Sequence, residues 1–102
     1  MIHVVAVITA KPGKREEMLR HFRANVPACL AEKGCIEYGP AVDAENALPF
    51  QTKAGPDTYL VIEKWESMEA LKAHAAAPHM AAFAAKVKEL IASRTIHILQ
   101  PA

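Results

Sequence analysis

Residues 2–10, IHVVAVITA, constrain the fold most, because they are apolar at nearly every position. Successive side chains of a β-strand point to opposite faces, so this run predicts a strand that is covered on both faces. A chain of 102 residues makes one domain, which we assign to residues 1–102, with one core on one side of that strand. The second face then needs another cover, and we expect a second copy of the chain, in a homodimer.

The rest of the chain alternates between strand and helix patterns. Helix periodicity appears at Met18, Phe22, Val26 and Cys29, while charged residues take the opposite side. In order after the first strand, we expect a helix over 14–33, a strand over 35–43, a strand over 58–65, a helix over 67–77, a helix from 78 and a strand over 94–100. This order predicts an α+β fold of the ferredoxin-like, split βαβ type: an antiparallel four-stranded sheet with helices on one face.

Local signals support two of the helix boundaries. Ser67 is a suitable N-cap for the helix over 67–77, and Pro78 can occupy the first turn of the next helix. The apolar stripe of that next helix is expected to run through Met80, Phe83, Val87, Leu90 and Ile91.

Residues 44–57 form a connection much longer than the usual 4–6 residues or so. Such a segment often has a role of its own. We expect it either to cover a pocket or to be a feature of a subfamily.

Charge and hydropathy exclude several classes of function. The net charge is +1, and the basic residues form no cluster, which argues against nucleic-acid binding. No purely apolar run, Val4–Ile8 included, is long enough to span a membrane, and no signal-peptide pattern is present. We therefore expect a cytoplasmic protein, in which Cys29 and Cys35 are buried free thiols.

The strand over 58–65 places Tyr59, Val61, Glu63 and Trp65 on one face. The two aromatic residues can be core or interface side chains, or the wall of a site for a flat substrate. A carboxylate between Val61 and Trp65 is expected to be partly buried, so it pairs with a cation or has a raised pKa. A structural salt bridge from Glu63 to an arginine or lysine is the favoured interpretation.

Two histidines flank Pro78. His74 can be a solvent-side residue at a helix end, or a general acid or base. A metal site made of His74, His79 and Glu63 is the weaker alternative, because the two histidines lack the spacing that places both on one helix face. Tyr38 can face a pocket or solvent. The chain has no nucleotide-binding motif, and we expect neither a bound cofactor nor a metal.

The residues GCIEY at 34–38 and the segment YLVIEKWESMEALKAHAAAPHM at 59–80 resemble the antibiotic biosynthesis monooxygenase family, in particular its small quinol monooxygenase-like members. The resemblance covers nearly the whole chain. Its most specific part is a set of residues at fixed spacing: Glu63, Trp65, Ser67, Leu71, His74, Pro78 and His79.

This resemblance implies a ferredoxin-like fold that dimerises through its sheets into an α+β barrel, with a pocket between sheet and helices in each subunit. It also implies functional roles for an aromatic residue at Trp65 and a histidine at His74. The haem-degrading members have an asparagine on the first strand, and this chain has none there, so haem degradation is not expected.

The leading hypothesis is a cofactor-independent monooxygenase that oxidises a small aromatic quinol, or a related electron-rich ring, with dioxygen. His74 and Glu63 are the candidate catalytic residues, and the candidate substrate-binding residues are Trp65, Tyr59, Tyr38 and His79. Two alternatives stay open. One is an isomerase or lyase, in which Lys53 and Lys64 are the lysines available for a phosphorylated substrate. The other is a non-catalytic ligand-binding dimer, in which Trp65 and Met80 fill the pocket and a salt bridge holds Glu63.

Overall fold

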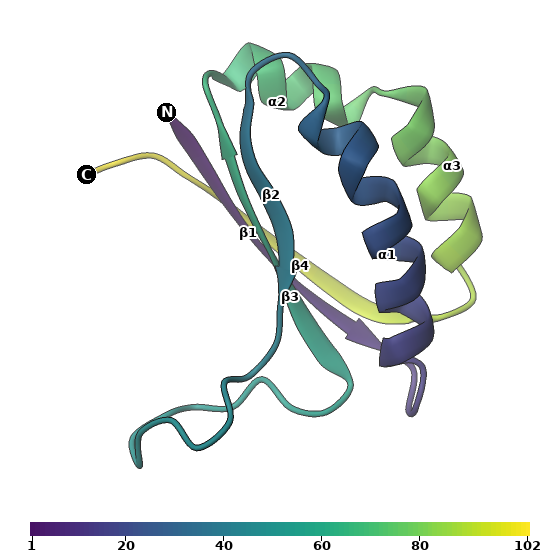
Figure 1. The fold of residues 1–102 in the computed structure, drawn as a ribbon, viewed down its shortest axis with the longest axis vertical. Helices are drawn as coiled ribbons and strands as arrows, with labels where there is room; N and C mark the ends of the chain where they lie inside the picture. Colours follow the sequence, from purple (N-terminus) through teal and green to yellow (C-terminus); the bar gives the residue numbers. More distant parts are fainter.

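The computed structural model describes all 102 residues and confirms the predicted α+β architecture. Its elements are β1 (Ile2–Ala10), α1 (Arg15–Leu30), β2 (Cys35–Ala41), β3 (Thr58–Trp65), α2 (Met68–Ala75), α3 (Pro78–Val87) and β4 (Ile91–Leu99). The strands form one antiparallel sheet in the order β2-β3-β1-β4, and all three helices lie on the same side of it (Figure 1). None of the helices combines the length and the apolar character that a membrane crossing requires.

Several boundaries differ from the predicted ones. The expected stripe of α3 was wrong at its end, because the helix stops at Val87 and Ile91 already belongs to β4, where it pairs with Ala10. Leu90 lies in the turn between them, and its backbone carbonyl accepts a hydrogen bond from the Lys11 N–H at 2.8 Å. The residues between Val87 and Ile91 include no glycine or proline, so apolar periodicity alone could not show where the helix ends. The helix α1 and the strand β2 end earlier than expected, at Leu30 and Ala41, and β4 begins earlier, at Ile91.

The break between α2 and α3 follows the predicted local signals. The Ser67 hydroxyl accepts a hydrogen bond from the Ala70 N–H at 3.2 Å and caps α2. Ala77 is extended, as the residue before a proline usually is, and Pro78 opens α3. This arrangement places His74 in the last turn of α2 and His79 in the first turn of α3.

The two faces of the sheet differ in how they are covered. On β1, Val4, Ala6 and Ile8 are buried beneath the helices, whereas the alternate residues Val5 and Val7 are only partly buried. No helix lies on the face that carries Val5 and Val7 (Figure 1). One chain therefore covers only one of the two apolar faces of β1.

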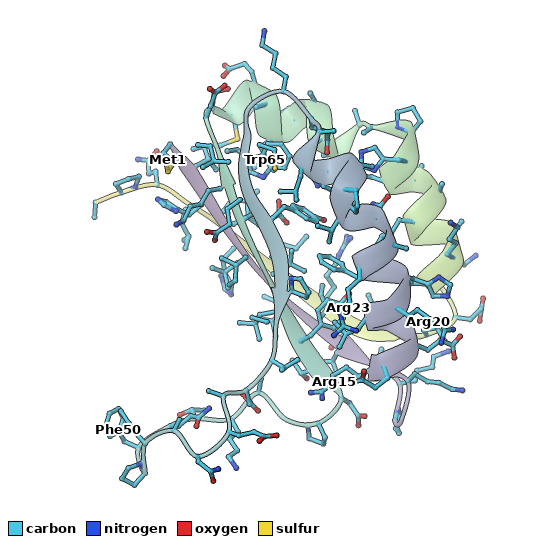
Figure 2. The ribbon with its side chains drawn as sticks, viewed as in Figure 1. Met1, Arg15, Arg20, Arg23, Phe50 and Trp65 are labelled. Carbon is cyan, nitrogen blue, oxygen red and sulfur yellow. The ribbon has the colours of Figure 1, made fainter.

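The connection between β2 and β3 leaves the end of the sheet on the side away from the helices (Figure 1). Its tip carries Phe50, which is 79% exposed (Figure 2). The Asp43 carboxylate accepts hydrogen bonds from the Ala54 and Gly55 N–H groups at 2.9 and 3.0 Å, and these bonds lower the pKa of Asp43. Because the connection points away from the helices, it does not cover the helix side of the sheet.

The two cysteines are both free thiols. Cys29 is fully buried as expected, but Cys35 is only partly buried, at the start of β2 on an edge of the sheet.

Candidate active site

An open cavity of about 770 Å³ lies between the sheet and the helices. Of its 24 lining residues, 20 are hydrophobic. Five of them are alanines of α2, α3 and the link between these helices: Ala75, Ala76, Ala77, Ala81 and Ala84. These short side chains leave space where larger ones would fill the core. On the β4 side the cavity is open, because Ile96 and Ile98 line it and are still 47% and 53% exposed.

Four of the six predicted site residues line this cavity: Tyr38, Tyr59, Glu63 and His74. The structure thus places side chains from β2, β3 and α2 around one apolar space. The other two predicted residues, Trp65 and His79, are not part of its lining. Lys53 and Lys64, the lysines considered for a phosphorylated substrate, are also absent from the lining.

His74 is 5% exposed, so the solvent-side interpretation of this residue was wrong. Its Nδ1 lies 2.6 Å from Oε2 of Glu32, which follows α1. A carboxylate is an acceptor, so this contact favours the tautomer in which Nδ1 carries the proton and donates it. No protein group forms a hydrogen bond with Nε2 of His74, and that nitrogen is left available as a base or acceptor.

Glu63 is 7% exposed and has no cationic partner among the ion pairs of the structure. The predicted salt bridge was therefore wrong. Its Oε1 accepts a hydrogen bond from the indole Nε1–H of Trp65 at 2.9 Å instead. Burial raises the pKa of Glu63, while the Trp65 hydrogen bond and His74 lower it and the charge of Glu32 raises it further. The nearest lysine in sequence, Lys64, points to the other face and pairs with Glu37 at 3.6 Å.

Trp65 is fully buried, at the end of the sheet near α2 (Figure 2). The centroid of its ring lies 4.7 Å from that of His74. The structure therefore does not place Trp65 as a wall for substrate. It lies behind the cavity, where it holds Glu63 by a hydrogen bond and supports the His74 ring by packing.

The two tyrosines form the aromatic part of the cavity wall. Tyr38 stacks on Phe22, with ring centroids 5.5 Å apart, and its ring lies 5.3 Å from that of His74. Burial raises the pKa of both phenols, that of Tyr59 to about 12. Both tyrosines therefore keep their O–H donors at neutral pH.

Glu32 also contacts the second histidine. Nε2 of His79 lies 3.3 Å from Oε2 of Glu32, although the geometry is not that of a hydrogen bond. Nδ1 of His79 forms a hydrogen bond with Oδ1 of Asn25 at 3.2 Å. Both histidines thus face Glu32 and not Glu63, so the structure does not assemble the predicted metal set of His74, His79 and Glu63.

A different trio could hold a metal ion, since ligand atoms of Cys29, Glu32 and His79 lie within 4.8 Å of one another. An ion there would compete with His74 for Glu32. It would also have to deprotonate Cys29, and burial raises the pKa of that thiol to about 11. The geometry therefore favours a role for Glu32 in holding His74 over a role as a metal ligand.

Sequence reasoning missed Glu32. It lies in a turn after α1 and is 42 residues from its partner His74, so no local pattern connects the two. The alanines of α2 and α3 carry no chemical signal in the sequence, although several of them line the cavity. The features expected of a non-catalytic dimer, a filled pocket and a salt-bridged Glu63, are both absent.

Comparisons with known proteins bear on the family and the fold of the chain. The family model described as "Antibiotic biosynthesis monooxygenase" matches residues 1–86. The chain is 42% identical to the Escherichia coli K12 protein named "Probable quinol monooxygenase YgiN", over 99% of this chain and 98% of that protein. The crystal structure of PA3566 from Pseudomonas aeruginosa matches 99% of this chain and 93% of its own, at 28% identity with a TM-score of 0.80. A conserved protein from Methanosarcina mazei Go1 matches 99% of this chain and 92% of its own, at 25% identity with a TM-score of 0.82.

Proposed function

Because the chain belongs to the antibiotic biosynthesis monooxygenase family, we propose that it is a cofactor-independent monooxygenase that oxidises a small aromatic quinol, or a related electron-rich ring, with dioxygen. The observation that carries this proposal is a buried histidine, held by a carboxylate at Nδ1, that faces an apolar cavity. The name of the 42% identical relative supports the substrate class.

In this proposal His74 is the general base. Its Nε2 takes the proton of a quinol hydroxyl, and Glu32 keeps the proton on Nδ1 and stabilises the cationic ring that results. The apolar cavity excludes water around the quinolate, which strengthens the electrostatic interactions inside the site.

The remaining steps use the electrons of the substrate. The quinolate gives one electron to dioxygen, and the two radicals recombine at a ring carbon that carries hydrogen, which forms a hydroperoxide. Loss of that ring proton breaks the O–O bond and releases water, which leaves a new carbonyl. One quinol and one dioxygen thus give one hydroxyquinone and one water. Glu63, whose pKa is raised by burial, can supply the proton that the departing hydroxide needs.

We assign substrate packing to Tyr38 and Tyr59, which line the cavity, with Phe22 beside them. Trp65 and His79 act as positioning residues behind the wall. Trp65 orients Glu63, and Nε2 of His79 lies 3.3 Å from the same Glu32 oxygen that His74 contacts.

The same proposal includes a homodimer that forms through the uncovered face of the sheet. This face carries apolar residues from neighbouring strands, with Val5 opposite Ile62 and Val7 opposite Leu60. A contiguous apolar surface of this kind is typical of a protein interface.

The test is product analysis by mass spectrometry with metal-stripped protein, a panel of naphthoquinols and anthrones, and ¹⁸O-labelled dioxygen. We expect one labelled oxygen in the product and none of that product under nitrogen, above a protein-free control for autoxidation. His74→Ala should lower turnover by at least about 100-fold, as expected for loss of a general base.

His21→Ala is the matched control, because His21 lies on α1 and does not line the cavity. Full turnover by His74→Ala would remove His74 from the mechanism. A product that forms equally well under nitrogen would instead support an isomerase or lyase.

A further inference from the structure

The cavity has polar groups at two separate places. Four of its 24 lining residues are not hydrophobic: Glu63, His74, Lys88 and Arg94. The first pair is the acid–base group described above. The second pair is cationic, and the proposed oxidation does not use it.

Strand register shows that the two pairs are far apart. Glu63 on β3 lies opposite Val4 of β1, whereas Arg94 on β4 lies opposite Ile8 of the same strand. Four residues of strand correspond to about 13 Å, and β3 and β4 are in addition two strand spacings apart, with β1 between them. His74 is at the Glu63 end, since its ring contacts those of Tyr38 and Trp65. Lys88 follows the last residue of α3, close in sequence to the start of β4, and is therefore placed with Arg94.

The two cations have no partner within the chain. Neither Lys88 nor Arg94 takes part in any ion pair of the structure. Glu89, the acidic residue beside Lys88, does not line the cavity. The neighbours of Arg94 along the cavity side of β4 are Ile96 and Ile98, which are apolar.

We propose that the ligand of this cavity is an elongated aromatic compound with a hydroxyl group at one end and a carboxylate at the other, and that Arg94, assisted by Lys88, binds the carboxylate. The planar guanidinium of arginine matches a carboxylate through two parallel hydrogen bonds. The placement of the ligand's hydroxyl group at His74 rests on the proposed function. The preference for a negative charge concerns binding alone and does not require turnover.

The distance between the pairs sets the shape of the ligand. The backbones of Glu63 and Arg94 are about 13 Å apart along the strands and about 10 Å apart across them. Because both side chains line the cavity and cover part of this distance, two or three fused rings with polar groups at opposite ends suit it. A carboxylate next to the hydroxyl cannot reach Arg94 while the hydroxyl lies at His74. The Arg94 residue therefore selects for the position of the charge as well as for its sign.

The test is calorimetric binding of three naphthalene compounds that are not quinols and are not oxidised. The first, 6-hydroxy-2-naphthoate, has its hydroxyl and carboxylate at opposite ends; the second is its carboxamide; the third, 1-hydroxy-2-naphthoate, has them adjacent. The wild-type chain should bind the first about tenfold more tightly than either of the others, the scale of one charge-assisted hydrogen-bonded pair.

Substitutions test whether Arg94 causes the preference for the carboxylate. Arg94→Gln should bind the first compound and its carboxamide equally, and Arg94→Lys should recover part of the difference. Arg20→Gln removes the same charge from an exposed position outside the cavity and should keep the full preference. Equal binding of the acid and amide by the wild-type chain, or a preference that survives in Arg94→Gln, would overturn the proposal.

These outcomes are separable from those of the oxidation test. A chain that shows the charge preference but oxidises no quinol contradicts the proposed function alone. A chain that oxidises neutral naphthoquinols but shows no charge preference contradicts the proposed carboxylate ligand and its binding by Arg94, and leaves the proposed function standing.

Discussion

The two faces of the sheet are formed by alternate residues of the same strands, but they have different surroundings. On the helix side, Val4, Ala6 and Ile8 form the floor of a cavity that also contains ionisable groups. On the other side, Val5 and Val7 belong to an apolar surface that lies open in the single chain. Alternation along one strand thus supplies a site on one face and a surface suited to assembly on the other.

The faces differ in how their polar groups are arranged. The helix side keeps Glu63 and His74 buried and connects them to Trp65 and Glu32 by hydrogen bonds. The open side has one ion pair, the half-exposed Lys64 with Glu37 of the edge strand β2, and the strand register also places His3 and His97 there. We therefore expect substitutions on the helix side to change chemistry and substitutions on the open side to change assembly.

The largest effect is expected from Ile62→Lys. Ile62 lies between Val5 of β1 and Gly39 of β2, in the middle of the open face. A lysine there would have to be desolvated in the dimer, so the dimer dissociation constant should rise by at least about 100-fold. Light scattering after size-exclusion chromatography measures this change.

Leu48→Lys is the control, because Leu48 is 60% exposed in the connection after β2. The comparison of faces also predicts that the monomeric Ile62→Lys chain still binds a cavity ligand. A variant that remains dimeric, or that becomes monomeric and loses ligand binding as well, would contradict the separation of the two faces.

A smaller effect is expected from Ala84→Leu on the helix side. Ala84 lines the cavity, and a leucine there would occupy part of the space that the proposed substrate needs. Turnover or ligand affinity should fall by about tenfold, while the melting temperature should stay the same or rise because the added methyl groups meet other apolar residues.

Ala85→Leu is the matched control, since Ala85 is the next residue of α3 and does not line the cavity. If both variants retained wild-type affinity, the cavity would not be the binding site. If only Ala84→Leu lost affinity and its assembly stayed unchanged, the comparison of faces would be strengthened.

Much of the difference between the two faces could be predicted from the sequence, because it depends on local periodicity. The apolar alternation of residues 2–10 indicates two faces that need covering, and that of 58–65 places Glu63 and Trp65 on one face. Ser67 and Pro78 mark the helix boundaries that bring His74 and His79 near each other. Each of these signals involves residues only a few positions apart.

The contacts within the site could not be predicted, because they join distant segments. The Glu32 carboxylate comes from the turn after α1, and its bond to His74 exists only once α1 and α2 are packed against the sheet. Alternation placed Trp65 on the same face as Glu63 but could not show that it lies behind the cavity. A buried carboxylate suggested a cationic partner, whereas the indole N–H beside it in the same strand satisfies Glu63.

The smallest effect is expected on stability, from Glu63→Gln. Burial raises the pKa of Glu63 above its ordinary value of 4.5, so the folded chain holds this proton more tightly than the unfolded chain does. The free energy of unfolding of the wild type therefore falls as pH rises from about 4.5 through the raised pKa, and stays lowered above it. Glutamine keeps an oxygen for the Trp65 N–H but carries no charge. We expect this variant to gain on the order of 1 kcal/mol over the wild type at pH 8, and less at pH 4.5.

Urea unfolding at several pH values measures this difference, with Glu37→Gln as the control that removes a carboxylate from the edge strand β2. A Glu63→Gln chain that is less stable than the wild type by the same amount at every pH would show that the charge of Glu63 carries no penalty. A gain that grows with pH, together with lost turnover, would show that the helix face keeps a destabilising carboxylate for its chemistry. The open face would then differ from the helix face, because assembly alone can explain the apolar residues of the open face, whereas Glu63 on the helix face lowers stability.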